Sequence, residues 1–292
     1  HIEEAGIHSG DSACVIPAYS LTSKARETIE NYTRMLALEL NTVGLINIQF
    51  AMKNDRVYVI EVNPRASRTV PFVSKVIDLP LAKIAAQIAV GKKLKNMNLE
   101  IHTQNGLIAV KKPVFPFNKF PRQNVFLSPE MKSTGEVIGF DTYLGSAYAK
   151  AESGAGNSLP IAGSVFISVN DSDKLKAIPL ARDFKELGFD IIATEGTAQL
   201  FSENGIGTNP IFKVGEGRPN IVDAIKNGKV QLVVNTPLGA QSRDDEYEIG
   251  RSAIRYKVPA ITTISGAQAA VRGIRNIKAG SIQYRSLQEI FT

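Results

Sequence analysis

Cysteine is nearly absent from this chain of 292 residues. The single Cys14 cannot form an internal disulfide, and a metal site built from clustered cysteines is excluded. We expect a reducing compartment, and we interpret Cys14 as a small packed apolar side chain and not as a reactive thiol.

Long apolar runs and a secretion signal are also missing. No run approaches the length of a membrane-spanning helix, and the first residues show no signal-peptide pattern. These absences predict a cytoplasmic protein with no membrane partner.

Charge of one sign is in only slight excess. The chain has 34 Lys and Arg against 28 Asp and Glu, a formal charge of +6, and both halves share the excess. An even spread argues against a nucleic-acid-binding surface. With 43% hydrophobic residues the chain can bury more than one core. The sequence begins at His1 and not at Met, within a segment that already has the pattern of folded structure. We therefore expect the C-terminal fragment of a larger enzyme.

A hairpin is predicted at residues 44–63, where two apolar strands flank a polar turn at 53–56. Glu61 and Asn63 stand two residues apart on the second strand, so their side chains leave one face. Gln49, on the first strand, is expected beside Glu61. Carboxylate and amide oxygens suit a hard cation such as Mg²⁺ that also binds polyphosphate oxygens. The alternative is that these residues are ordinary polar side chains on the solvent-exposed face of an antiparallel sheet and bind no metal.

Two arginines follow this hairpin in the segment NPRASRTVP. Arg65 and Arg68 lie where the backbone leaves the strand, so their guanidinium groups can converge on an anion. An acidic ligand, a cation and paired arginines together favour a phosphoryl-transfer site over a solvated surface with no catalytic role.

The first part of the chain, residues 1–153, mixes helical and strand patterns. Apolar periodicity predicts helices at 22–40, at 80–90 and from about 143 to 153. Between 106 and 140 the pattern is mixed and broken by prolines, which predicts a loop or an edge strand. The expected fold class is α+β, an antiparallel sheet with helices.

A stretch rich in glycine, serine and proline at residues 154–163 predicts a linker. From 164 to 292, short apolar runs alternate with helical stretches, which is typical of a parallel sheet covered on both faces. Pro219 is predicted to occupy the first position of a helix. The second part is therefore expected to be a compact α/β domain.

Polar residues follow the apolar runs of this second part. Because the carboxyl ends of parallel strands meet at one edge of a sheet, we expect these residues to line one site. Each turn alone is better explained by helix capping. Their convergence, with two lysines and no acid expected nearby, favours a phosphorylated small molecule. The residues are Lys174, Thr194, Thr197, Lys213 and Asn235.

These motifs resemble the large-subunit family of carbamoyl phosphate synthetases. Residues 46–94, from INIQF to GKKL, look like the end of an ATP-grasp unit, and the segments AGIHSGDSACVIP, PFNKF and PEMKSTGEVIG are similar to other stretches of that subunit. The resemblance spans the whole chain. The family has two such units in tandem, and EVNPR with the domain that follows resembles the second unit, which phosphorylates carbamate.

The resemblance implies an ATP-dependent ligase that makes carbamoyl phosphate from bicarbonate, ammonia and ATP, for pyrimidine or arginine biosynthesis. It implies Mg²⁺ or Mn²⁺ held by Gln49, Glu61 and Asn63, and Arg65 and Arg68 as catalytic groups. A small glutaminase subunit is the partner that supplies ammonia in this family. The nucleotide is expected to lie along Gly6, Ile7, His8, Ser9, Gln49 and Glu61. No glycine-rich phosphate-covering loop or lysine-bearing nucleotide lobe precedes Glu61, so we expect the isolated chain not to turn over ATP.

Residues 161–292 resemble the methylglyoxal-synthase-like domain that ends this family's large subunit and binds allosteric nucleotides. The resemblance implies that the five strand-end residues contact an effector such as UMP or IMP. Thr236 continues the motif, whereas Pro237 replaces a hydroxyl residue of some relatives. Methylglyoxal synthase needs a histidine and this part has none, so that catalysis is not expected. The effector, its sign and the oligomeric state stay open.

Some relatives also bind ornithine where the two parts meet. The resemblance places Glu3, Asp11 and Thr262 among the ligands, but Lys112 stands where a further glutamate is expected. A lysine would repel the ammonium groups of ornithine. Weak or absent ornithine activation is therefore predicted.

Two other functions compete with catalysis. The chain can act as a regulatory nucleotide-binding module whose ATP-grasp remnant is only structural support. The chain can also belong to a different ATP-grasp ligase, such as a relative of biotin carboxylase. That alternative does not explain why the second domain is present.

Overall fold

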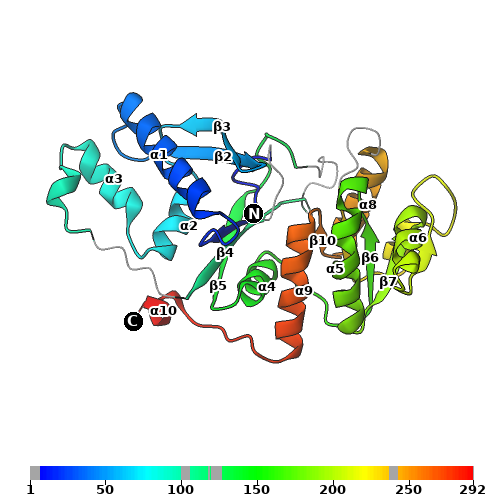
Figure 1. The fold of residues 1–292 in the computed structure, drawn as a ribbon. Helices are drawn as coiled ribbons and strands as arrows, with labels where there is room; N and C mark the ends of the chain where they lie inside the picture. The colour runs from blue at the N-terminus through cyan, green and yellow to red at the C-terminus, as the bar shows by residue number, and fades with distance from the viewer. Residues whose placement is uncertain (1–6, 100–105, 118, 120–126, 237–242, 292) are drawn as a thin grey trace.

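The computed structural model describes residues 7–99, 106–117, 119, 127–236 and 243–291. Figure 1 shows two parts side by side, one with antiparallel sheets and the other with a parallel sheet between helices. Within the described ranges, no helix combines the length and apolar character needed to cross a membrane.

Two separate antiparallel sheets form the first part. The predicted hairpin is confirmed: Asn54 and Asp55 in its turn have φ of 50° and 58°, the left-handed conformations that a two-residue type I′ turn requires. The other sheet has the strand order β1-β4-β5. The strands are β1 (Cys14–Ile16), β2 (Asn47–Lys53), β3 (Arg56–Asn63), β4 (Ile108–Val114) and β5 (Gly135–Asp141).

Strands β4 and β5 occupy the region whose mixed pattern predicts a loop or an edge strand. β1 pairs with residues 109–111 of β4, so among the residues that the structure describes β5 is the one strand beside Pro113. A proline has no N–H to donate, and it is tolerated where one side of a strand is unpaired. This end of β4 is therefore an edge as expected, but the mixed pattern concealed two full strands.

The predicted helices of the first part are present within a residue or two of their expected limits. The first begins where the Thr22 hydroxyl accepts a hydrogen bond from the Ala25 N–H at 3.2 Å. The last lies directly on β5, because a Cβ at Gly139 would overlap the Ala147 carbonyl oxygen. The helices are α1 (Ser23–Glu39), α2 (Thr69–Val76), α3 (Leu81–Ala89), the 3₁₀ turn η1 (Leu94–Asn96) and α4 (Leu144–Gly154).

A five-stranded parallel sheet of order β10-β9-β6-β7-β8 forms the second part, as predicted. Its strands are β6 (Ser164–Ser168), β7 (Asp190–Thr194), β8 (Asn209–Ile211), β9 (Leu232–Asn235) and β10 (Ala260–Ile261). Its helices are η2 (Asp171–Asp173), α5 (Lys174–Glu186), α6 (Glu195–Glu203), α7 (Ile221–Lys226), α8 (Arg243–Arg255) and α9 (Ile264–Lys278).

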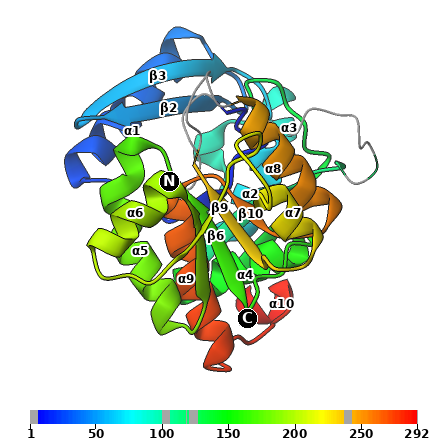
Figure 2. The same cartoon turned by 90° about the vertical axis from the view of Figure 1, so that its right-hand side faces the viewer.

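Helices cover both faces of this parallel sheet (Figure 2). Val165 and Ile167 of β6 share a core with residues of α5, α6 and α9. Phe166, between them, points the other way and joins a second core with residues of α7 and α8. Strand residues therefore alternate between two apolar layers, which explains the continuous apolar run of β6.

The start of α7 differs from the prediction for Pro219. The N-cap is Asn220, whose side chain accepts from the Asp223 N–H while the Asp223 carboxylate accepts from the Asn220 N–H. Pro219 precedes this reciprocal cap and is not in the first helical position. This capping box satisfies the N–H groups of both Asn220 and Asp223, which would otherwise lack a partner at the start of the helix.

The two parts share one hydrophobic core. Helix α4 packs on α9, and residues such as Tyr148 and Ala270 belong to the same buried cluster. Glycines allow the close approach: a Cβ on Gly145 would lie 2.5 Å from the Arg272 carbonyl carbon, and one on Gly273 would lie 2.8 Å from the Gly145 oxygen. The helices therefore contact through their backbones.

The chain returns to the first part after α9. The short helix α10 (Leu287–Phe291) lies near β5, on the far side of α4 from the parallel sheet (Figure 1). Leu287 and Ile290 pack against the core formed by Phe72, Ala109 and Phe140, and the Phe291 ring meets that of Phe140 edge-on, with centroids 6.3 Å apart. The last two helices of the chain, α9 and α10, thus both contact the first part.

Candidate functional site

The β2–β3 hairpin places the candidate metal ligands on one face. Gln49 is directly opposite Glu61 in the ladder, and Asn63 is two residues beyond Glu61 on the same strand. Directly opposite residues in an antiparallel pair point to the same side. The register shifts just after Gln49, where Phe50 pairs with Val59. This bulge is an irregularity of the kind found beside active sites.

The polar groups of this face bond to one another. Asn63 donates from Nδ2 to Oε1 of Glu61 at 3.0 Å, and its Oδ1 accepts from Arg65 at 3.3 Å. The Gln49 amide donates to the Ile7 carbonyl at 3.3 Å, which leaves its Oε1 free to act as a ligand. The donor set is thus one carboxylate with two amide oxygens.

This donor set fits a shared cation. The described residues contain no group of three or more His, Cys, Asp or Glu side chains that could hold a metal by themselves. A hard divalent cation usually keeps several sites for water or phosphate oxygens when one or two carboxylates hold it. The face around Glu61 therefore suits a cation bound jointly with a polyphosphate.

The predicted nucleotide segment lies against this hairpin. Its backbone is held through the Gln49 contact at Ile7 and by Lys111, a fully buried lysine whose Nζ donates to the Ser9 oxygen at 3.1 Å. The Gly10 N–H donates to Nδ1 of His8 at 3.0 Å, so this network places the imidazole proton on Nε2. Gly6 and Glu3 lie outside the described residues.

The two candidate arginines bond to different neighbours. Arg65 lies against Asn63 and the Ala66 carbonyl. Arg68 donates from one terminal nitrogen to the carbonyl and the hydroxyl of Ser133, at 2.8 and 2.7 Å. Sequence reasoning missed Ser133, because no local pattern connects a loop serine with an arginine 65 positions away.

The candidate effector residues gather at the carboxyl edge of the parallel sheet. Thr194 ends β7, Thr197 lies in the first turn of α6, and both are buried. Asn235 ends β9 opposite Ser168, which ends β6, and the Ser168 hydroxyl lies 3.2 Å from the Thr194 hydroxyl. The chain leaves β6 toward β7 on one side and leaves the neighbouring β9 toward β10 on the other. The edge between β6 and β9 is therefore a topological switch point, where open α/β sheets bind ligands.

Further polar groups lie at this edge. The Thr236 hydroxyl accepts from the Asn170 backbone N–H at 3.0 Å, next to the start of α5. Pro237, at which the sequence departs from the family pattern, lies outside the described residues.

The expectation that no acid lies near the two lysines was wrong. Asp171 pairs with Lys174 at 2.7 Å and Glu216 with Lys213 at 3.5 Å, each three positions apart in a turn. The hydrogen bond and charge of Lys174 lower the pKa of Asp171. The Asp171 carboxylate is 92% exposed and that of Glu216 52%, so solvent screens both pairs and a bound anion can replace either acid.

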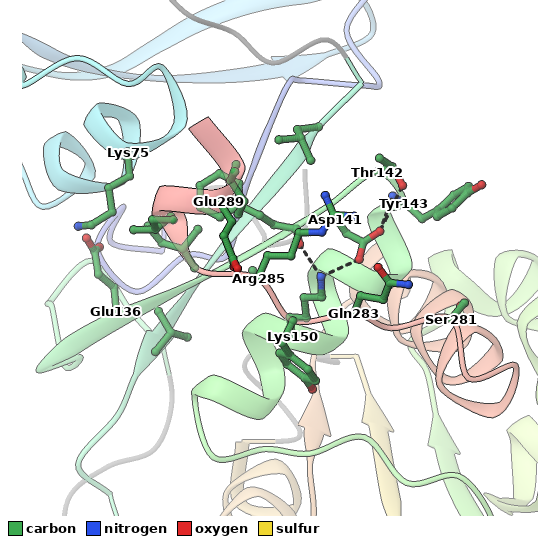
Figure 3. Close-up of a pocket in the computed structure, with 18 residues that line it drawn as sticks. Lys75, Glu136, Asp141, Thr142, Tyr143, Lys150, Ser281, Gln283, Arg285 and Glu289 are labelled. Carbon is green, nitrogen blue, oxygen red and sulfur yellow. Dashed lines mark hydrogen bonds and ion pairs between the residues drawn. The ribbon is translucent and has the colours of Figure 1, made fainter. Parts of the chain in front are cut away.

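A cavity of about 610 Å³ lies elsewhere, between β5, α4 and the C-terminal segment (Figure 3). In it Lys150 bonds to the Asp141 carboxylate at 2.8 Å and to the Phe140 carbonyl at 2.7 Å. None of the candidate metal or effector residues lines this cavity. The size of this cavity is therefore not evidence that it is the catalytic or the effector site.

A second cavity of about 410 Å³ contains Thr262 and Lys112. Lys112 forms an ion pair with Glu152 at 2.7 Å, and both side chains are largely buried. Asp11, expected beside them as an ornithine ligand, is fully buried, and its carboxylate accepts from the Lys132 and Ser133 N–H groups. Its bonds are thus those of a structural group.

Known proteins match the chain along its whole length. A family model described as the carbamoyl-phosphate synthase L chain ATP-binding domain matches residues 3–97, and one described as the MGS-like domain matches residues 176–262. The carbamoyl phosphate synthase large chain of Archaeoglobus fulgidus is 55% identical over 290 residues, which are 99% of this chain and 27% of that protein. The large chain of Acidobacterium capsulatum is 52% identical over 294 residues, with the same coverage.

A shorter relative covers the same region. The "Carbamoyl phosphate synthase large chain, C-terminal section" of Aquifex aeolicus is 46% identical over 312 residues, which are 100% of this chain and 58% of that protein. The chain therefore spans 27% of the two large chains and little more than half of the separate section.

Proposed function

This chain belongs to the carbamoyl phosphate synthase large-chain family, as a C-terminal section with the end of an ATP-binding domain and an MGS-like domain, and we propose that its first part completes a site that phosphorylates carbamate. In this reaction a carbamate oxygen attacks the γ-phosphorus of ATP, the bond to the β–γ bridging oxygen breaks, and ADP leaves. The products are carbamoyl phosphate and ADP. No covalent enzyme intermediate is needed.

The proposed roles follow from the donor set. Gln49, Glu61 and Asn63 hold Mg²⁺ or Mn²⁺, which neutralises phosphate charge when it is bound. Arg65 and Arg68 stabilise negative charge on the transferred phosphoryl group and on carbamate. The segment Ile7–Ser9 lies along the nucleotide, with the Nε2–H of His8 as a donor.

One observation supports this proposal most strongly. Gln49 lies directly across from Glu61, and its amide also bonds to Ile7. The face that carries the candidate metal ligands and the backbone of the candidate nucleotide segment therefore meet at one side chain, Gln49.

The test is Glu61→Gln in a full-length large chain that contains this section. Formation of carbamoyl phosphate from carbamate and ATP is expected to fall on the order of 100-fold, since an amide cannot supply the carboxylate charge. Asp55→Asn is the matched control, because it makes the same change in the turn of the same hairpin. Equal activity of Glu61→Gln and the control would refute the proposal.

The isolated chain is proposed to be inactive. Met35 and Leu38 of α1 are 67% and 72% exposed, and Tyr58 and Ile60 of β3 are 49% and 44% exposed. Apolar faces of this size are usually covered by another part of a protein. We propose that the rest of the ATP-grasp unit covers them, and that a small glutaminase chain supplies ammonia to the whole enzyme.

The parallel-sheet part supports a second function, a regulatory nucleotide site. Its strand ends bring together two buried threonines, Asn235 and two lysines at a switch point. A nucleotide monophosphate such as UMP or IMP is the proposed effector, with its phosphate near Thr194 and Thr197. For the isolated chain this binding is the proposed activity.

A further inference from the structure

The Arg68 guanidinium is anchored along one edge only. One terminal nitrogen lies 2.8 Å from the Ser133 carbonyl oxygen and 2.7 Å from the Ser133 hydroxyl, with the Met131 sulfur at 3.2 Å. A guanidinium has five N–H groups, two of them on each terminal nitrogen. The two oxygens of Ser133 therefore use both protons of the first nitrogen.

Three N–H groups remain, on the second terminal nitrogen and on Nε. Among the residues that the structure describes, no hydrogen bond or ion pair of Arg68 involves these two nitrogens. This pair of nitrogens forms the fork that binds a carboxylate or a phosphate through two parallel hydrogen bonds. The anchored arginine is thus ready to bind an oxyanion.

Ser133 is itself fixed by the interior. It is 4% exposed, and its N–H donates at 2.9 Å to the carboxylate of Asp11, which has no exposed surface. Its hydroxyl lies 3.3 Å from the Gly10 carbonyl, to which it donates. Gly10 in turn donates to His8. One serine therefore connects the arginine with the turn that carries the nucleotide-side histidine.

From this geometry we infer that Ser133 is a positioning residue for Arg68. Its two oxygens hold one edge of the guanidinium so that the opposite edge faces the oxyanion, and its contact with Gly10 fixes the arginine relative to the turn around His8. The inference rests on the proposed phosphoryl transfer. It adds a residue that touches neither ATP nor carbamate.

Rigidity is the physical reason for such a residue. An arginine side chain has many rotamers and loses them when it binds. An arginine that is already held loses less freedom on binding, and a misplacement of about 1 Å at a catalytic group can cost on the order of 100-fold in rate. Ser133 therefore acts mainly on kcat.

A double-mutant cycle in the full-length large chain tests this inference. Ser133→Ala is expected to lower kcat for carbamate phosphorylation about 10-fold, with a smaller change in KM for ATP. When Arg68→Ala is already present, adding Ser133→Ala is expected to change kcat less than about 2-fold, because the group that it positions is gone. Ser133→Thr keeps the hydroxyl and is expected to restore most of the rate.

Ser128→Ala is the matched control. That serine lies in the same segment, and its hydroxyl accepts from the Glu130 N–H without contacting Arg68. Equal losses from Ser133→Ala with and without Arg68 would show a merely structural role and overturn the inference, as would an unchanged kcat in Ser133→Ala.

Failure of this inference can be distinguished from failure of the proposed phosphoryl transfer. An unchanged kcat in Arg68→Ala alone overturns both the role of Ser133 and that of Arg68, whereas Glu61→Gln tests the metal face independently.

Discussion

Gly145 and Gly273 bring the two parts of the molecule into backbone contact. A Cβ added to the first would lie 2.5 Å from the Arg272 carbonyl carbon, and one added to the second would lie 2.8 Å from the Gly145 oxygen. Beside them Asn276 donates to the Ser146 hydroxyl at 2.8 Å. The interface between α4 and α9 is thus as close-packed as a domain interior.

Gly145→Ala is therefore expected to destabilise the whole chain. The added methyl group would meet two backbone atoms and the Arg272 Cβ, none of which can move without the helix, and overpacking of this kind typically costs about 1–3 kcal/mol. Chemical denaturation measures the change in the free energy of unfolding. Gly196→Ala, at a helical glycine with open space around it, is the control, and it is expected to be neutral or slightly stabilising. A neutral Gly145→Ala would contradict the packing described for α4 and α9.

UMP or IMP is expected to raise the melting temperature of this chain. A ligand that binds only the folded form at 100 times its Kd stabilises by about 2.7 kcal/mol, which corresponds to several degrees. Thr197→Val removes a buried hydroxyl at the sheet edge and is expected to abolish the shift. Thr28→Val, at an exposed hydroxyl of α1, should leave the shift intact. ATP with Mg²⁺ should do little, and a large ATP shift would contradict the proposed incompleteness of its site.

The attachment of α10 is expected to depend on pH. Hydrogen bonds from the Ser286 N–H and then from its hydroxyl lower the pKa of the Glu289 carboxyl. A group with a lowered pKa in the folded state stabilises above its unfolded pKa, and it loses that contribution as the pH falls through the folded value. Amide exchange in α10 should therefore speed up in acid. Ser286→Ala should speed it at neutral pH and flatten the pH dependence, and an unchanged profile would refute this role.

Ornithine is expected not to stabilise the chain. Lys112 already occupies the Glu152 carboxylate in a largely buried pair, so this acid is not available to an ammonium group of ornithine, which would also have to approach the lysine. Calorimetry with the full-length large chain is the measurement. Tight binding of ornithine would show that Lys112 moves out of the 410 Å³ cavity.

Short-range patterns predicted the hairpin and the shared face of Glu61 and Asn63. A period of two residues places Glu61 and Asn63 on one face. The turn at Asn54 and Asp55 sets the pairing as far as Phe50 and Val59, and the irregularity just after Gln49 brings Gln49 opposite Glu61. In the parallel sheet, alternation of apolar runs with helices was sufficient to place Asn235 and Thr194 at one edge. Apart from the irregularity after Gln49, these features follow from local patterns that can be read in the sequence.

Long-range contacts could not be predicted in the same way. Asp11 meets Ser133 across 122 positions, and Arg68 meets it across 65. No periodicity in the sequence indicates either contact. The acids beside Lys174 and Lys213 are a different case, because their spacing of three residues was visible and was overlooked.

After α9 the chain returns to the first part, where α10 packs. This return determines whether cleavage of one peptide bond can separate the two parts. Residues 155–163 are mostly exposed and offer a protease a site between α4 and β6. Cleavage there would leave α9 packed on α4, and Leu287 and Ile290 seated on the Phe140 side of the antiparallel sheet. The nicked halves should therefore elute together on gel filtration, as a two-chain particle that falls apart only when denaturant unfolds their common interior.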